Sequence, residues 1–155
     1  VDSATYLNIN QISYKGIEFE YERHLSATSS IDMSYTHQLN SSDDIKSFTG
    51  MATNLLKFGV LTHFSEHWTF SGSILHAGDW RVIEGTTQRN PNPNDYTIVQ
   101  ANIRYSVSPQ LSLTLGGDNL LNENVFHPEI SRRNMNSLPQ GHLERTVYLG
   151  VMYRF

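Results

Sequence analysis

The 155-residue sequence contains no cysteine, no long apolar run and no excess of basic residues. The absence of cysteine excludes a disulfide framework and cysteine-ligated zinc, and it suits a protein that passes through an oxidising compartment. No stretch reaches the ~18 apolar residues that mark a transmembrane helix. The 15 acidic residues outnumber the 11 lysines and arginines, which gives a net charge of −4. No basic patch for nucleic acid is therefore expected.

Aromatic residues are plentiful, with eight tyrosines, seven phenylalanines and two tryptophans, although only 38% of the residues are hydrophobic. The mean hydropathy of −0.41 is typical of a soluble protein. A membrane β-barrel has a similarly low average, because half of each strand is polar and faces the lumen. Average hydropathy therefore does not separate these two classes of protein.

The last residues of the chain alternate strictly between apolar and mostly polar side chains. Successive side chains point to opposite faces of a strand, so one face of this strand is apolar. That face is formed by Val147, Leu149, Val151, Tyr153 and Phe155. An apolar face that ends in aromatic residues is typical of a strand that faces lipid and stops at a membrane interface. The alternative is the last strand of a soluble β-sandwich.

The same alternation recurs in six earlier segments: 17–22, 31–39, 56–64, 68–74, 99–107 and 111–116. No segment of useful length shows helical periodicity. The sequence therefore predicts an all-β fold, an antiparallel up-and-down meander of about seven long strands. Strands of roughly ten residues fit a tilted membrane strand better than the average soluble strand. The expected architecture is a segment of a transmembrane β-barrel.

The predicted connections alternate between short and long. Short turns are expected at 25–29, 65–67 and 108–110, and long polar connections at 40–54, 79–95 and 120–143. Short turns on one side and long loops on the other are typical of outer-membrane barrels. Aromatic residues near the short turns would form a girdle at the periplasmic interface; these are Phe64, Trp68, Tyr105, Tyr153 and Phe155.

Several segments, in this order, resemble the C-terminal part of a TonB-dependent outer-membrane receptor. They are Gly16-Ile-Glu-Phe-Glu20, Asp95-Tyr-Thr-Ile-Val-Gln-Ala-Asn-Ile-Arg-Tyr105, Gly117-Asp-Asn-Leu-Leu-Asn-Glu123 and Tyr148-Leu-Gly-Val-Met-Tyr-Arg-Phe155. The third segment is similar to the Asp-Asn-Leu-Phe-Asp/Asn box of the family, with Leu121 in place of the usual phenylalanine.

The resemblance implies a larger parent protein, with a 22-stranded barrel and a folded N-terminal plug. Residues 1–155 would be about the last third of the barrel, and the missing initiator methionine and signal peptide fit an excised part. The parent would import a scarce nutrient, such as a ferric siderophore, haem or cobalamin, with energy from the inner-membrane TonB complex. It would lie in the outer membrane of a Gram-negative bacterium, in contact with lipid, lipopolysaccharide and the barrel assembly machinery.

Two of the predicted long connections carry candidates for ligand binding. One contains Trp80, Arg81 and Arg89, and the other contains His127, Arg132 and Arg133. Arginine presents a planar fork of donors that suits a carboxylate-bearing chelate. The alternative is that these loops contact lipopolysaccharide phosphates or nothing.

Other residues have a structural interpretation. Asp118, Asn119 and Leu120 of the box are expected to set a bend through local hydrogen bonds, and Gly116-Gly117 to mark a bend or bulge. The row Glu18, Glu20 and Glu22 is interpreted as a solvated lumen wall rather than a cation path. The resemblance implies that the terminal residues Val147, Leu149, Val151, Tyr153 and Phe155 are read as an assembly signal.

No catalytic motif is present, and the seven histidines lack metal-ligand spacing. We therefore expect a transporter that is not an enzyme, with no cofactor and no metal site in this chain. Two alternatives stay open. One is a passive porin or small outer-membrane barrel, which upstream sequence would distinguish. The other is a soluble all-β binding module, which partition between detergent and buffer would reveal.

Overall fold

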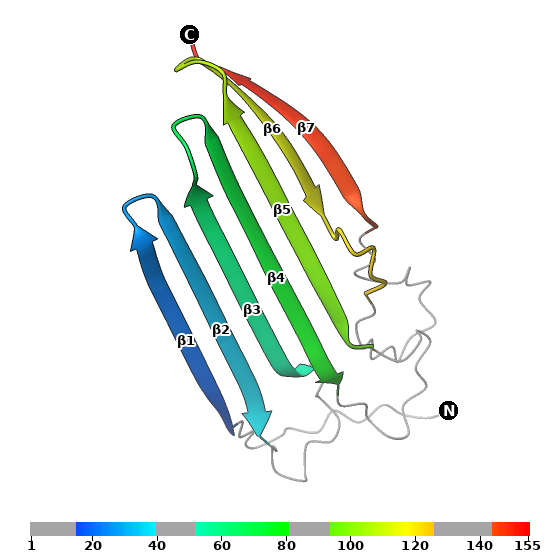
Figure 1. Ribbon diagram of the computed structural model, residues 1–155. Coiled ribbons are helices and arrows are strands. Elements are labelled where there is room, and N and C mark those ends of the chain that lie inside the picture. The colour runs from blue at the N-terminus through cyan, green and yellow to red at the C-terminus, as the bar shows by residue number, and fades with distance from the viewer. Residues whose placement is uncertain (1–14, 40–51, 81–93, 126–143) are drawn as a thin grey trace, which may run out of the picture.

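The computed structural model describes residues 15–39, 52–80, 94–125 and 144–155. They form seven strands, namely β1 (Lys15–Ser26), β2 (Ser29–Leu39), β3 (Ala52–His63), β4 (Trp68–Trp80), β5 (Tyr96–Ser106), β6 (Leu111–Asp118) and β7 (Thr146–Tyr153). All neighbours pair antiparallel in the order β1 to β7 (Figure 1). The predicted meander is confirmed. In this part of the chain, no helix is long and apolar enough to cross a membrane.

Short and long connections lie at opposite ends of the sheet. The links between β1 and β2, β3 and β4, and β5 and β6 are short and lie at the top of Figure 1. Backbone hydrogen bonds close the link between β5 and β6, with Val107 N donating to Leu111 O at 2.9 Å and Leu111 N to Ser108 O at 3.2 Å. The other three connections leave from the opposite end. The alternation predicted from the sequence is therefore present.

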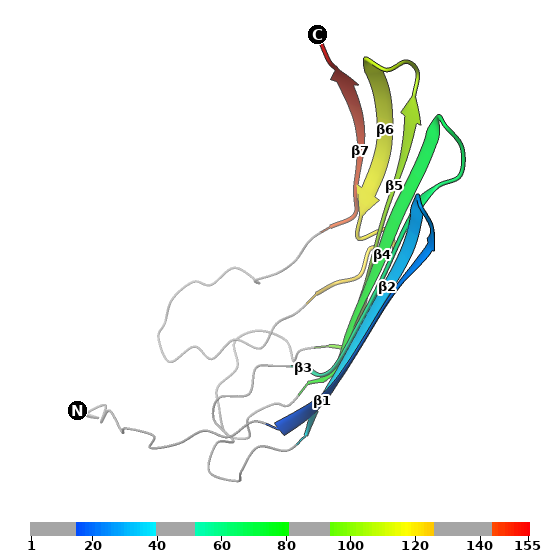
Figure 2. The ribbon, with the colours of Figure 1, turned by 90° about the vertical axis from the view of Figure 1, so that its left-hand side faces the viewer.

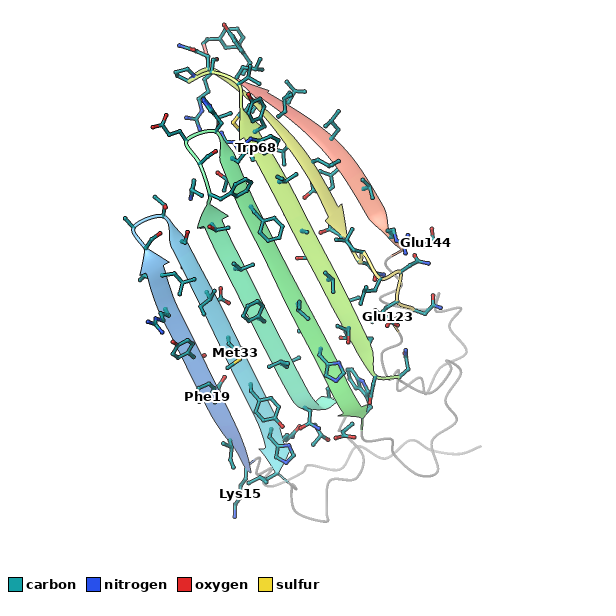
Figure 3. The ribbon with its side chains drawn as sticks, viewed as in Figure 1. Lys15, Phe19, Met33, Trp68, Glu123 and Glu144 are labelled. Atoms are coloured by element: carbon teal, nitrogen blue, oxygen red, sulfur yellow. The ribbon has the colours of Figure 1, made fainter. Side chains whose placement is uncertain are left out.

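The ladder register shows that the sheet has one apolar and one polar face. Residues opposite each other in an antiparallel ladder share a face. One cross-strand row runs Met33, Phe58, Ile74 and Val99, and the adjacent row on the other face runs Asp32, Gly59, Ser73 and Gln100. We call these the apolar face and the polar face. Figure 3 shows Phe19, Met33 and Trp68 together on the face turned toward the viewer.

The apolar face carries the residues predicted to face lipid: Phe58, Val60, Ile103, Leu113, Leu149 and Val151. Nothing in the described residues covers it, since Leu149 is 73% exposed and Val151 is 68% exposed. Only three hydrophobic residues of the described part are buried. The sheet is curved rather than flat (Figure 2). A wide, uncovered apolar face on a curved sheet fits a barrel wall in lipid and does not fit a soluble sandwich.

Aromatic rings gather at the short-turn end, as the girdle prediction requires. Trp68 lies between two of them, with its ring centroid 4.6 Å from Tyr105 and 6.2 Å from Phe64. At the end of β7, Tyr153 and Phe155 meet edge to face at 5.1 Å. Amphipathic rings collect where hydrocarbon meets water, so this end is suited to a membrane interface.

Of the two expectations for Gly116-Gly117, a bend or a bulge, the bulge is wrong. Both glycines pair in regular register with β5 and β7. The glycine at 116 makes room for a neighbour instead, because the Tyr148 side chain crosses over it and donates a hydrogen bond to Asn102 Oδ1. A Cβ at position 116 would lie 2.5 Å from Cζ of the Tyr148 ring. The contact joins β5, β6 and β7 on the polar face.

We expect Gly116→Ala to destabilise the sheet by about 1–3 kcal/mol, the usual cost of overpacking. The added methyl group would push the Tyr148 ring away and break its bond to Asn102. Tyr148→Phe removes the bond and keeps the ring, so it should cost less, about 0.5–1.5 kcal/mol. Urea unfolding of the barrel from detergent or bilayers measures both. Equal stability of Gly116→Ala and the wild type would contradict this account.

Candidate functional site

The polar face changes in character from one side of the sheet to the other. On β1 and β2 it is acidic, with Glu18, Glu20, Glu22 and Asp32 in neighbouring rows. Toward β5 and the chain terminus it carries Arg104 and, beyond β7, Arg154, which line a groove near the short-turn end together with Glu66 and His67. The glutamate row is exposed to solvent, as expected for a lumen wall.

An apolar cluster interrupts the polar face at the end where the long connections leave. Leu55, Ala77 and Tyr96 form one cross-strand row, and Leu75 and Ile98 lie in the next. Ala77, Tyr96 and Val125 are buried and form the centre of the cluster. Trp80, the last residue of β4, packs against it with its ring 6.1 Å from that of Tyr96. This part of the polar face is therefore suited to an apolar or aromatic group.

The sequence did not predict this cluster, because β3 to β5 were interpreted as strict alternation between apolar and polar residues. The signal is a break in that alternation. Leu55-Leu56 and Ile74-Leu75 are adjacent apolar pairs, and in each pair one residue must lie on the polar face.

The cluster is completed by a turn that follows β6. Asn119 is 1% exposed and takes a left-handed conformation with φ of 47°. Its side chain donates to Glu123 O and accepts from Glu123 N, both at 2.9 Å. The backbone N of Leu120 donates to Val99 O at 2.9 Å. Together these bonds direct the chain so that Val125 reaches the cluster.

A family profile described as TonB dependent receptor-like, beta-barrel, matches residues 1–120 of this sequence. The chain belongs to the TonB-dependent receptor β-barrel family. This membership places it in the outer membrane of a Gram-negative bacterium, with the apolar face toward lipid and the polar face toward the barrel lumen. The family is one of receptors and not of enzymes.

Among solved structures, the copper transporter OprC is similar in fold to this chain, with a TM-score of 0.67 at 15% sequence identity. The likeness covers 93% of this chain and 24% of that protein, so the chain spans about a quarter of the length of its structural neighbour. A search of curated proteins gives no match.

Only one of the predicted ligand-binding candidates lies within the described residues. It is Trp80, which ends β4 and belongs to the apolar cluster rather than to the following loop. The other candidates, Arg81, Arg89, His127, Arg132 and Arg133, lie outside the described residues. Their role as ligand contacts stays a prediction.

The last strand of the chain, β7, is the outermost strand of the described sheet. Val147, Leu149 and Val151 pair with β6 through Gly117, Leu115 and Leu113. Beyond β7, Arg154 N donates to Gln110 O at 2.9 Å, which ties the end of the chain to the last short turn. Phe155 projects from this end, fully exposed.

The described residues contain no group of three or more histidine, cysteine, aspartate or glutamate side chains that could hold a metal ion. His63 and His76 lie on opposite faces, because His63 pairs with Thr69 on the polar face and His76 with Leu56 on the apolar face.

We expect Asn119→Ala to destabilise the turn after β6 by about 1–3 kcal/mol, because it leaves the Glu123 backbone groups without their buried partner. Alanine also lacks the tolerance of asparagine for a left-handed backbone. Hydrogen exchange across residues 119–125 measures the loss. Asn119→Gly is the matched control, since it removes the same bonds but relieves the backbone. A smaller effect for Asn119→Gly than for Asn119→Ala is the expected order, and the reverse order would contradict it.

Proposed function

We propose that the chain is the C-terminal portion of the barrel of a receptor that imports a scarce nutrient across the outer membrane, energised through the TonB complex. The observation that carries the proposal is the two-faced curved sheet with an uncovered apolar face, in a chain that belongs to the TonB-dependent receptor β-barrel family. In this proposal, the plug and earlier strands lie in sequence that precedes residue 1, and they carry the contact with TonB.

The edges of the sheet support a larger barrel. Among the described residues, β1 pairs only with β2, and β7 only with β6. A strand edge in lipid leaves backbone N–H and C=O groups without partners, which is why membrane barrels are closed. Further strands of the parent would pair with both edges. The small share of the structural neighbour that this chain covers agrees with this arrangement.

The proposed ligand site lies at the long-connection end of the polar face. There the partly exposed ring of Trp80 covers the buried ring of Tyr96, with 6.1 Å between the two centroids. A macrocycle or an aromatic chelate would pack well on such rings, which favours a ferric siderophore, haem or cobalamin. Copper is a further candidate to test, because the structural neighbour is a copper transporter.

The test uses the intact parent gene in a Gram-negative host that lacks its own receptors for these nutrients. Growth on a ferric siderophore, haem or cobalamin as sole source, and copper uptake as a fourth arm, are measured with and without the tonB gene. Growth or uptake in one arm that requires both the parent gene and tonB supports the proposal. Uptake that requires the parent gene and persists without tonB would indicate a passive porin, and no gene-dependent uptake in any arm would contradict the proposal.

A further inference from the structure

The ends of the strands from which the long connections leave are joined to one another by side-chain hydrogen bonds. We call the residues that make these bonds the root belt; they are His37, Asn54, Asp79, Asn94, Asp95, Asn119 and Asn122. They lie next to all three long connections, at the lower end of the sheet in Figure 1.

The first half of the root belt crosses β2, β3, β4 and the start of β5. Asn54 Oδ1 accepts from Tyr35 Oη at 2.8 Å and pairs with His37 Nδ1 at 2.7 Å. Because an amide oxygen only accepts, His37 donates from Nδ1. Asn54 Nδ2 in turn donates to a carboxylate oxygen of Asp79. The backbone N of Asp79 then donates to Asp95 Oδ1 at 2.9 Å.

The second half continues from the start of β5 to β7. Asn94, next to Asp95 in the chain, donates from Nδ2 to Asn124 O at 2.9 Å. Asn124 belongs to the turn that Asn119 closes. Asn122 Oδ1 accepts from Arg145 N at 3.1 Å, immediately before β7. The hydrogen bonds and the intervening main chain thus form one continuous path from β2 to β7.

Backbone conformation is an independent observation at the same place. Among the described residues, three other than glycine have positive φ, namely Asp79 at 56°, Asn119 at 47° and Asn122 at 56°. All three belong to the root belt, and none lies in a short turn. A left-handed backbone outside glycine persists only where the surrounding structure holds it, and such residues cluster at functional sites.

We propose that the root belt couples the bases of the three long connections, so that loosening one base loosens the others, and that Asn54 and Asp79 are positioning residues in this coupling. A sheet ladder alone gives no reason for coupling across the six strands from β2 to β7 at one end of the sheet. A continuous path of side-chain hydrogen bonds that polarise one another provides a reason for such coupling. Preorganised bases would lower the entropic cost of binding a ligand at this end of the sheet. That consequence rests on the proposed function, whereas the coupling itself does not.

The test exchanges the two partners at the middle of the path. Asn54→Asp places a carboxylate against the carboxylate of Asp79 and removes the donor between them, while Tyr35 and His37 keep an acceptor. Asp79→Asn keeps an oxygen that accepts from Asn54, and asparagine tolerates the positive φ. The double variant Asn54→Asp/Asp79→Asn restores the bond with its direction reversed.

Amide hydrogen exchange is measured on the intact receptor in nanodiscs without ligand. In Asn54→Asp, we expect several-fold faster exchange at the distant Glu123 and Arg145 amides. Asp79→Asn and the double variant should exchange at nearly the wild-type rate. The Arg154 amide, which bonds Gln110 at the opposite end, should not change in any variant.

Faster exchange confined to β3 and β4 in Asn54→Asp would overturn the proposal, as would no recovery in the double variant or a faster rate at Arg154.

If Asn54→Asp does not assemble, Asn122→Gly tests the same path from the other side. It removes the acceptor for Arg145 N and leaves φ unstrained. Coupling is reciprocal, so the Asp79 amide should then exchange faster, and an unchanged Asp79 amide would overturn the proposal. Because no outcome depends on uptake, failure of the root belt proposal is separate from failure of the proposed function.

Discussion

Ile103→Arg in the intact receptor is expected to cost about 1–3 kcal/mol of folding free energy in a bilayer, because Ile103 lies between the middle of the apolar face and its aromatic end. Ile103 lies on the apolar face of β5, opposite Phe70 on one side and Leu115 on the other. Because β5 is paired on both sides, the guanidinium cannot escape along a sheet edge. The aromatic end of this face at Tyr105 and its polar end at Thr97 bracket the position, so the charge would lie within the hydrocarbon. The expected cost corresponds to about a 5- to 150-fold change in the folding equilibrium.

Gln100→Arg is the matched control for this prediction. It lies on the same strand and on the polar face, in the row with Ser73, Gly59 and Asp32. An arginine there can reach water on the polar face, so only the weak bond from Ser73 Oγ is lost. Reversible urea unfolding from lipid vesicles measures both variants. Equal losses for Ile103→Arg and Gln100→Arg would refute the assignment of the faces.

Deletion of Tyr153–Phe155 from the intact receptor is expected to reduce the amount of assembled barrel to a small fraction of the wild-type level. The deletion removes the edge-to-face pair of Tyr153 and Phe155 and the bond from Arg154 N to Gln110 O. In a soluble sheet, such a loss would only loosen the end of one strand. If assembly of the receptor depends on the terminal aromatic strand, the barrel does not form. Heat-modifiable mobility on gels measures the assembled barrel in cells.

Two variants separate recognition of the terminus from local packing. Tyr153→Ala/Phe155→Ala keeps the chain length and the backbone bond of Arg154, and it should assemble as poorly as the deletion. Phe64→Ala removes another exposed aromatic side chain at the same end of the sheet and should assemble normally. A normal level of heat-modifiable barrel in the deleted receptor would disprove the role of the terminus.

The fold could be predicted because alternation along a strand is a local property. The apolar residues at alternate positions of β2, such as Ile31 and Met33, assign the neighbouring residues to one face or the other, and this assignment needs no information about which strands pair. Meander order followed from the alternation of short turns and long connections. The register of the strands was not predictable, because several registers satisfy the same alternation within one sheet face.

The candidate site was harder to predict because it depends on contacts between distant residues. The bond from Asn54 to Asp79 and the packing of Val125 on Ala77 join segments that carry no local sign of each other. Gly116 was misjudged for the same reason. A glycine in a strand suggests a bulge when it is read alone, whereas its reason here is the ring of Tyr148 from the next strand.

The alternation of short and long links also has a kinetic meaning. The pairs β1–β2, β3–β4 and β5–β6 are each closed by a short turn, so bringing their strands together loses little chain entropy. The ladders between these pairs close much longer loops, and β7 reaches β6 only across residues 119–145. Local pairings form faster than those with large sequence separation. We therefore expect the described strands to form three hairpins rapidly, and β7 to pair with β6 in a separate, slower step.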